Sequence, residues 1–537
     1  MPENLPILSL ITFAPLVGAF LVLLLPGGRG NWLRGTAIAF TVIPLLLTLW
    51  LYASYQPAAG GGAFEERLTW LAIPLNIEGL GGGIASLKLS FEYHLSVDGI
   101  SMPLLLLTSI VSTMSALASV HIRKRRKTYY ALFLLLLTGI YGVFLARDLV
   151  LFFIFFEVTL IPMFFLIGIW GYYGREKAAT RFLVYNGLGS AAMLLAFLLL
   201  VATLGFSSVD GMNWTFSGNY DTLLNNLGDA NAFANTDTEQ MKYYGWFLSE
   251  NMRWAAFLLL LVAFGIKVPI FPFHTWMLKV HTEAPPAVVM IHSGILLKMG
   301  VYGLIRFALH LFPEQAHSWT TVFAVLGVVN ILYGAILACV QTEFKLVLAY
   351  SSISHMGIVL LGIASLGEVG LQGAIFQSVS HGLISALLFL VVGSIYERTG
   401  TTELGELGGL AKAMPFMSGI LLLAGLASLG LPGLSGFVGE FLSFLGLFGS
   451  MKALTAVGVL GILFAAIYVL RSVLSITYGE MPEKYSGLKD ARFVEALPMV
   501  ALSALIVLLG VYPSLLTDLM QNGFGGLLEQ LQTRVGG

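Results

Sequence analysis

Apolar stretches long enough to cross a membrane recur along this 537-residue chain, separated by short polar segments. A helix needs about 20 residues to cross the hydrocarbon core of a bilayer. Because lipid offers the backbone no hydrogen-bond partners, only helices and closed barrels can span it. The chain is 57% hydrophobic and 11% charged, with a mean hydropathy of +0.86. The sequence therefore predicts an all-α integral membrane protein.

About fourteen segments have the length and composition of a transmembrane helix. They lie near residues 5–25, 31–53, 97–120, 129–146, 148–170, 181–205, 253–272, 285–308, 318–340, 345–364, 369–395, 415–446, 451–477 and 495–517. We expect two of them to be broken, because proline interrupts a helix. In one, Lys267 is followed by Pro269 and Pro272. The other, 415–446, is too long for one straight span and carries LGLPGLSG at its middle.

The two expected breaks fall at corresponding places in two sets of five spans. We therefore predict five-helix repeats at 129–308 and 318–477, after an N-terminal three-helix segment at 1–128. Residues 478–537 would form a C-terminal helix and tail. An odd number of spans in each repeat would make the repeats inverted in the membrane, as in several transporter folds.

Lysine and arginine are distributed unevenly between alternate loops. With the N-terminus outside, seventeen of them fall in the cytoplasmic loops and seven in the outside segments. The positive-inside rule then places both termini on the non-cytoplasmic side. The cluster HIRKRRK at 121–127 could bind anionic lipid, but its simpler role is to anchor this topology. Of the long outside loops, 54–95 is compatible with a short hairpin and 206–252 is a polar cover.

Several functions are excluded by composition. A net charge of −1 gives no basic surface for nucleic acid, and no dinucleotide-binding or P-loop motif occurs. The single cysteine, Cys339, excludes a disulfide framework and an iron–sulfur cluster held by this chain alone. We expect the chain to bind no cofactor. The N-terminus lacks a cleavage signal, so 7–25 is expected to stay as the first span, and the absence of a transit peptide favours a bacterial plasma membrane.

Lys267 is the strongest functional signal, because a charge deep in a span costs about 2.5–3.5 kcal/mol and is presumed functional. Other ionisable residues are placed at a similar depth by their positions within the spans. They are Glu157, Lys298, His355, His381 and Glu440. Four unpaired charges would cost about 12 kcal/mol, whereas two lysines and two carboxylates can neutralise one another. We predict that this buried row carries protons, with Glu157 as the partner of Lys267.

Each residue of the row also has a structural alternative. Glu157 could serve as a fixed partner of Lys267, and Lys298 could extend to a lipid headgroup. Glu440 could cap the half-helix that begins after Pro432.

His355 and His381 are placed in the row, but they could instead be neutral, hydrogen-bonded residues that pack the helices together. The polar linker after the first helix break is expected to be a simple loop; it contains His274, Lys279, His281 and Glu283. The alternative is that these residues lie near a cytoplasmic entrance for protons. Arg306 and Arg471 lie near span ends and are expected to stabilise them.

Five motifs in this order resemble the antiporter-like membrane subunits of respiratory complex I, most of all the chain M (subunit 4) type. They are FFEVTLIPMFFLIGIWG (155–171), GIKVPIFPFHTWMLKVHTEAP (265–285), HSGILLKMGVYGLIR (292–306), KLVLAYSSISHMG (345–357) and GLPGLSGFVGEF (430–441). The resemblance covers nearly all of the chain from about residue 90 onward. The first 90 residues and the loop 206–252 match poorly.

The resemblance implies a fourteen-helix fold with two inverted repeats, beside other antiporter-like chains in a membrane arm. It also implies that the six residues of the row form a proton path and that Glu157 and Lys267 form a gating pair. Glu440 is diagnostic, because sister subunits generally have lysine there. NADH or another donor, flavin, iron–sulfur clusters and quinone would be bound by other subunits of this proton-pumping NADH:quinone oxidoreductase.

Two other functions are considered. A subunit of a multi-subunit cation/proton antiporter would share the fold and the lysine–glutamate pair, but Glu440 argues against it. A haem-carrying membrane cytochrome would use His355 and His381 as ligands, and it leaves both lysines unexplained.

Overall fold

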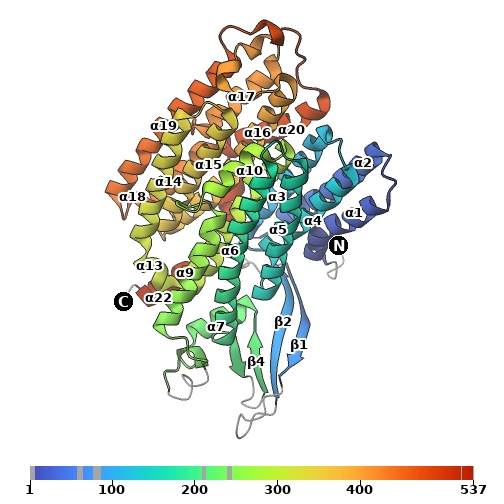
Figure 1. Cartoon of the computed structure of the whole chain (residues 1–537). Coiled ribbons are helices and arrows are strands. Elements are labelled where there is room, and N and C mark those ends of the chain that lie inside the picture. Colours follow the sequence, from blue (N-terminus) through green and yellow to red (C-terminus); the bar gives the residue numbers. More distant parts are fainter. Residues whose placement is uncertain are drawn as a thin grey trace.

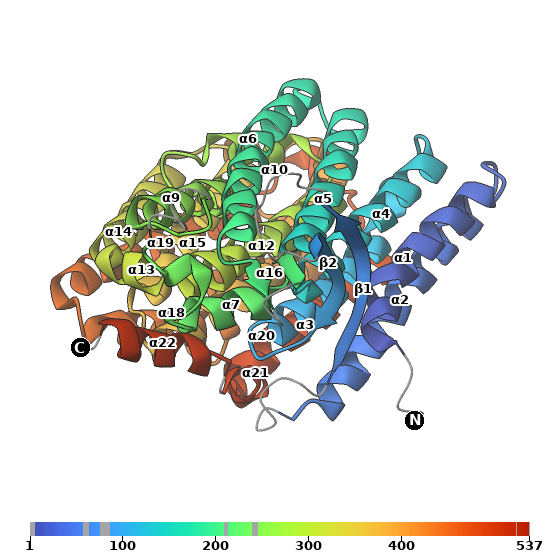
Figure 2. The same cartoon turned by 90° about the horizontal axis from the view of Figure 1, so that it is seen from below.

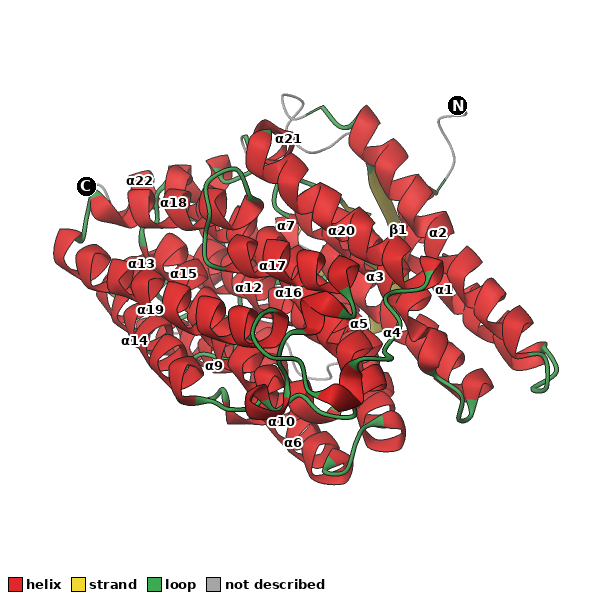
Figure 3. Cartoon of the chain, turned by 90° about the horizontal axis from the view of Figure 1, so that it is seen from above, coloured by secondary structure: helices red, strands yellow, loops and turns green. Residues whose placement is uncertain are grey.

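The computed structural model describes residues 6–56, 64–75, 86–208, 213–238, 245–521 and 523–535. Within these residues the chain is a bundle of helices with a small sheet at one end (Figures 1 and 3). Twelve helices in the described ranges are long and apolar enough to cross a membrane. They are α1 (Ile7–Leu24), α2 (Gly30–Ser54), α3 (Ser101–Ala118, continued by the 3-10 turn η2, Ser119–His121), α4 (Arg126–Leu145), α5 (Leu149–Trp170), α6 (Arg175–Ala202), the composite helix Pro286–Leu309, α14 (Thr320–Val340), α15 (Phe344–Ala364), α16 (Glu368–Thr399), α19 (Lys452–Thr477) and α20 (Phe493–Val511).

The two remaining predicted spans are broken where the sequence indicates. Helix α9 (Glu250–Lys267) ends at Lys267, and α10 (Thr275–Glu283) begins after a non-helical stretch. Helix α17 (Pro415–Ser428) is separated from α18 (Ser435–Phe448). Gly430 and Gly433 in that gap have φ of 79° and 92°, left-handed conformations that glycine adopts without steric cost. The division into two inverted repeats stays a prediction.

The composite helix Pro286–Leu309, expected as one regular span, contains two π-helical segments. It consists of α11 (Pro286–Ile291), a π-helical turn η4 (His292–Leu296), α12 (Leu297–Gly303) and a second π-helical segment η5 (Leu304–Leu309). π-Helical turns are rare and often occur at functional sites. The sequence carries no simple signal for them.

A four-stranded sheet covers one end of the bundle, called the sheet end below (Figure 2). Its order is β1-β2-β4-β3, from β1 (Glu65–Pro74), β2 (Ser86–Ser96), β3 (Phe206–Ser208) and β4 (Asn213–Ser217). Strands β1 and β2 pair antiparallel, in line with the hairpin expected in 54–95. The loop 206–252 contributes β3 and β4, and β4 pairs parallel with β2.

Short elements complete the loops. They are α7 (Tyr220–Gly228), α13 (Pro313–Ser318), α21 (Ser514–Met520), α22 (Gly525–Val535), and the 3-10 turns η3 (Phe233–Asn235), η6 (Leu404–Glu406), η7 (Leu410–Lys412) and η8 (Glu483–Tyr485).

Both termini lie at the sheet end. The amide of Leu8, at the start of α1, donates to Oε1 of Glu66 in β1 over 2.7 Å. At the other terminus, α22 packs against α13 at the same end of the bundle (Figure 1). The cluster 121–127 lies at the opposite end, called the basic end below, because α3 runs away from the sheet and α4 returns to it. The structure therefore agrees with both termini sharing one side.

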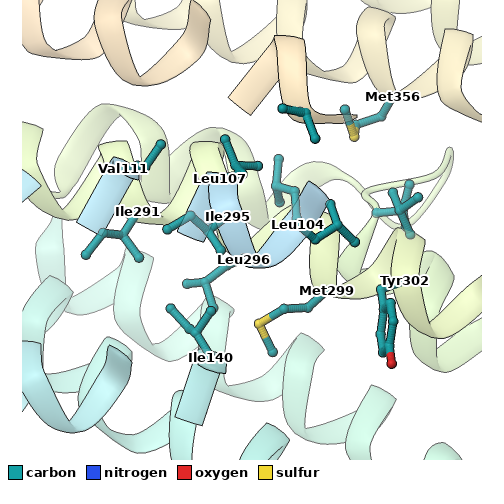
Figure 4. Close-up of a cluster of buried hydrophobic side chains, with 14 of the residues drawn as sticks. Leu104, Leu107, Val111, Ile140, Ile291, Ile295, Leu296, Met299, Tyr302 and Met356 are labelled. Atoms are coloured by element: carbon teal, nitrogen blue, oxygen red, sulfur yellow. The ribbon is translucent and has the colours of Figure 1, made fainter. Parts of the chain in front are cut away.

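Two helices form the centre of the bundle. The apolar stretches of the composite helix Pro286–Leu309 and of α16 are wholly buried, whereas only 28% and 33% of the corresponding stretches of α2 and α19 are buried. Figure 4 shows Leu104, Leu107 and Val111 of α3 packed against the composite helix, with Ile140 and Met356 nearby. Helices that are apolar all round belong in such a position. The polar groups on these two central helices are thereby kept away from lipid.

Close contact between α14 and α15 depends on two facing glycines. A Cβ added at Gly357 would lie 2.6 Å from the carbonyl oxygen of Gly327, and one added at Gly327 would lie 2.9 Å from that of Gly357. Such small residues allow membrane helices to approach closely. Because α15 carries His355, this contact also fixes the position of part of the buried row.

We predict that Gly357→Leu destabilises the chain by about 1–3 kcal/mol or more, because the helices must separate to accept the side chain. The measurement is the thermal midpoint and yield of the purified membrane complex. Gly187→Leu is the matched control, since no atom lies within 4 Å of a Cβ added there. Equal stability of the two variants would contradict the proposed packing role.

Candidate functional site

Lys267 is the last residue of α9, directly before the helix break, and is 2% exposed. Its Nζ donates to Oδ1 of Asn186 in α6 over 3.2 Å. The same Nζ lies 5.0 Å from the centre of the Phe156 ring and 5.6 Å from that of Phe182, distances suited to cation–π attraction. The amine is thus held by one amide oxygen and two aromatic rings.

Glu157, the predicted partner of Lys267, makes no direct salt bridge with it in the described chain. It lies on a half-buried face of α5, and no carboxylate–ammonium contact within 4.0 Å joins the two described side chains. Its buried Oε1 has no hydrogen-bond partner in the described part of the chain. Asn186 takes one of the three donors of the amine, and the Glu157 carboxylate acts on Lys267 electrostatically without direct contact. The partnership of Glu157 with Lys267 stays a prediction.

Lys298 lies in α12 directly after the π-helical turn and is fully buried. Its Nζ donates to the carbonyl oxygen of Ser293 and lies 2.7 Å from Nδ1 of His381 in α16. The other ring nitrogen of His381 lies 3.2 Å from the hydroxyl of Ser352 in α15. Extension of Lys298 to a headgroup is excluded by these contacts. The role of His381 as a relay between these groups stays a prediction.

His355 continues the row towards the second helix break. Its ring centre lies 5.3 Å from that of His381. Its Nδ1 lies 3.5 Å from Oε1 of Glu440 and 3.3 Å from Nε2 of Gln377. Its Nε2 lies 3.3 Å from the hydroxyl of Ser428, the last residue of α17.

Glu440 faces the row and does not cap α18. It is 5% exposed, and the N-cap position of α18 is held by Leu434, which makes no side-chain cap bond. Its carboxylate lies against the backbone of Gly430, so a Cβ there would overlap its oxygen. The capping alternative is therefore not what the structure shows.

Two further histidines, neither of which was predicted to belong to the row, lie between the lysines. Nε2 of His281 in α10 lies 3.0 Å from Nδ1 of His292 in the π-helical turn, and both are fully buried. The ring of His292 also contacts that of Phe182, which faces Lys267. The expectation that His281 is a loop residue is wrong, because α10 folds back into the bundle. The signal that could have found His292 is its position six residues before Lys298.

The other residues of that linker divide between buried and surface positions. His274 is 2% exposed, with Nε2 3.1 Å from the hydroxyl of Tyr333. Lys279 is exposed. Glu283 accepts a hydrogen bond from the amide of Gly174 over 2.7 Å, which stabilises the loop between α5 and α6.

The two span-end arginines have structural partners. Arg306 pairs with Asp98, and Arg471 donates to the carbonyl oxygens of Cys339 and Gln341. Their expected stabilising role agrees with these contacts.

A small cavity adjoins His355 and His381. It measures about 10 Å³, and its polar wall is formed by Ser351, Ser352, Ser385 and Ser428. A volume of about 10–15 Å³ with polar partners is what one water needs. Hydroxyl groups and a water at this place would link the two rings.

The site is a row of titratable groups linked by hydrogen-bond contacts or packed rings. Lysine, histidine and carboxylate side chains all gain and lose protons, and serine hydroxyls both donate and accept. Within the described ranges, no group of three or more His, Cys, Asp or Glu residues is arranged to hold a metal ion. The chemistry that this arrangement favours is proton transfer.

Comparison with known proteins identifies the family. Residues 146–467 match the family described as NADH:quinone oxidoreductase/Mrp antiporter, TM. The chain is 36% identical to NADH-quinone oxidoreductase subunit M of Rhodobacter capsulatus, over 99% of this chain and 98% of that one. It is also 36% identical to NAD(P)H-quinone oxidoreductase chain 4 of Gloeobacter violaceus, over 97% and 92%.

Solved structures give the same result. A chain of respiratory complex I from Thermus thermophilus superposes with a TM-score of 0.79 at 31% identity, covering 97% of this chain and 99% of that one. A chain of the Mrp complex from Dietzia sp. has a TM-score of 0.77 at 22% identity, covering 98% of each, and shares the fold. The chain therefore belongs to the NADH:quinone oxidoreductase/Mrp antiporter family of transmembrane subunits, as a complex I subunit of the M (chain 4) type.

Proposed function

We propose that this chain moves protons across the membrane as a non-redox subunit of a complex I-type NADH:quinone oxidoreductase. The observation that carries the proposal is the buried row from Lys267 to Glu440, in which Lys298, His381 and His355 lie in successive contact. NADH, flavin, iron–sulfur clusters and quinone would be bound by other subunits. Redox energy would reach this chain through them.

Proton movement along the row needs no large rearrangement at its centre. A protonated Lys298 donates to Nδ1 of His381, which leaves the lysine neutral and the imidazole charged. Loss of the proton from Nε2 towards Ser352 and a water returns His381 to neutrality. His355 then takes up a proton and passes it to Glu440, whose carboxylate lies 3.5 Å away. Each transfer exchanges one proton between neighbouring groups.

The two ends of the bundle indicate the direction in which protons would cross the membrane. The basic end carries the cluster 121–127, and the positive-inside rule assigns it to the cytoplasm. The sheet end and both termini then face away from the cytoplasm of a bacterial plasma membrane. Protons would enter at the basic end and leave at the sheet end.

Partners would be further membrane-arm subunits, including other antiporter-like chains. Strand β1 forms one edge of the sheet, and Leu68 and Trp70 on it are 68% and 52% exposed. Exposed apolar edge strands are usually covered by another chain. We propose that a neighbouring subunit covers this edge.

The multi-subunit cation/proton antiporter is the less favoured function. The Mrp complex chain is 22% identical to this chain, so its likeness shows a shared fold only. The M and chain 4 subunits are 36% identical over nearly the whole chain. Glu440, which argues against the antiporter in the sequence, also places its carboxylate 3.5 Å from Nδ1 of His355.

For Lys267→Arg we expect loss of the protons that this chain pumps, because arginine keeps the charge but does not release a proton at accessible pH. The measurement is protons pumped per quinone reduced by the whole complex in vesicles. Lys452→Arg, at the exposed start of α19, is the control and should pump normally. Normal pumping by Lys267→Arg would favour a fixed structural charge.

For Glu440→Gln we expect intact assembly with reduced pumping, because glutamine keeps the size of the side chain but cannot take up the proton. Subunit content of the purified complex is compared with its pumping ratio. Glu368→Gln, at an exposed position in α16, is the control. If assembly fails instead, Glu440 has a structural role that its contacts do not explain.

A further inference from the structure

Gln377 lies beside the last two groups of the row, but none of the proton transfers along the row uses it. It is part of α16, four residues before His381, and is 1% exposed. Its Nε2 lies 3.3 Å from Nδ1 of His355. The other end of the same amide, Oε1, is buried and has no hydrogen-bond partner in the described part of the chain. A buried acceptor that lacks a partner calls for an explanation.

The contact with Gln377 determines where His355 carries its hydrogen. An amide nitrogen only donates, so Nδ1 of His355 accepts from it and holds no hydrogen of its own. The hydrogen of the neutral ring is then on Nε2, which lies 3.3 Å from the hydroxyl of Ser428. A neutral imidazole has two such tautomers, and the hydrogen bond made by one ring nitrogen determines which of them forms.

The same ring nitrogen faces the carboxylate of Glu440, whose Oε1 lies 3.5 Å from Nδ1 of His355. Because Nδ1 presents a lone pair in this conformation, it has no proton to pass on. The ring is therefore arranged as it would be after a transfer to Glu440. Gln377 and Glu440 share one nitrogen, and a transfer to the carboxylate requires that the amide first give up its donation to that nitrogen.

A close approach of α16 to α18 holds the amide in place. A Cβ added at Gly439 would overlap Oε1 of Gln377 and would lie 2.6 Å from its Cα. One added at Gly373, about one turn earlier in α16, would lie 2.5 Å from the backbone nitrogen of Ser443. The amide thus rests on the backbone directly before Glu440, with no side chain between them. Since the two ends of an amide are nearly equal in size, a half turn about its last bond exchanges oxygen and nitrogen in the same space.

We propose that Gln377 is a positioning residue that selects the tautomer of His355, and so determines when His355 can pass a proton to Glu440. The inference rests on the proposed function. With its nitrogen towards Nδ1, the amide stabilises the discharged ring described above. With its oxygen towards Nδ1, it stabilises the tautomer that carries a hydrogen there, and Oε1 gains the partner that it lacks.

The cycle moves one proton. In the loaded tautomer Nε2 of His355 is free and takes up a proton from the row through Ser428 and a water in the adjoining cavity. The ring is then charged, and its Nδ1–H bond breaks as the carboxylate of Glu440 takes up that proton. The neutral ring keeps the hydrogen on Nε2, and Gln377 turns its nitrogen to the vacated Nδ1, which opposes return of the proton. Reloading transfers the hydrogen from Nε2 to Nδ1 through water.

The first test is Gln377→Met in the whole complex in vesicles, a change that keeps the length of the side chain and removes both donor and acceptor. We expect unchanged subunit content, and protons pumped per quinone reduced to fall towards the level of Lys267→Arg. Gln315→Met, at a glutamine outside the row that is 2% exposed, is the control and should pump normally. Normal pumping by Gln377→Met together with loss in Lys267→Arg would overturn the tautomer role but not the proposed function. Normal pumping in both would overturn both.

A second variant, Gln377→Glu, separates tautomer selection from packing. A neutral carboxylic acid both donates and accepts, as the amide does, whereas an ionised one only accepts. We therefore expect this variant to pump at low pH and to lose pumping as rising pH ionises the new acid, which faces His355 and Glu440. The unchanged chain is the control and should not show this loss. A pumping ratio of Gln377→Glu that is the same at every pH at which the complex stays intact would contradict the tautomer role and favour simple packing.

Discussion

Everything around the functional site depends on the cost of keeping charge out of water in a membrane. An ionisable group in the hydrocarbon costs several kcal/mol unless polar partners surround it. Lys298 meets this requirement through Ser293 and His381, and Lys267 through Asn186 and two aromatic rings. Apart from Ser293, which lies one turn earlier in the same composite helix, these partners come from α6, α5 and α16, so the charges determine which helices must meet at the centre of the bundle.

The irregular backbone serves the same constraint. Breaking α9 after Lys267 allows α10 to return into the bundle and bring His281 to His292. The break between α17 and α18 places Ser428 and Glu440 on the two sides of one gap, both facing His355. The π-helical turn before Lys298 exposes a backbone carbonyl to its amine. Interrupted helices are tolerated at membrane depth where protein surrounds them, as it does here.

Much of this arrangement could be predicted from the sequence. Hydropathy locates the spans, prolines and glycines locate the breaks, and the depth of each ionisable residue predicts the row, because all three depend on local sequence. The partners of each charge depend on tertiary packing. Spacing therefore could not predict the hydrogen bond from Lys267 to Asn186, the return of His281 into the bundle or the π-helical turns at His292 and Leu304.

The central claim is that Lys267 and Lys298 act in one connected path. The most direct test compares Lys267→Arg, Lys298→Met and the double variant by protons pumped per quinone reduced in vesicles. Groups that act as a unit are not additive, so we predict that the double variant loses no more than either single one. Losses that add in the double variant would show two independent paths and contradict the connected row.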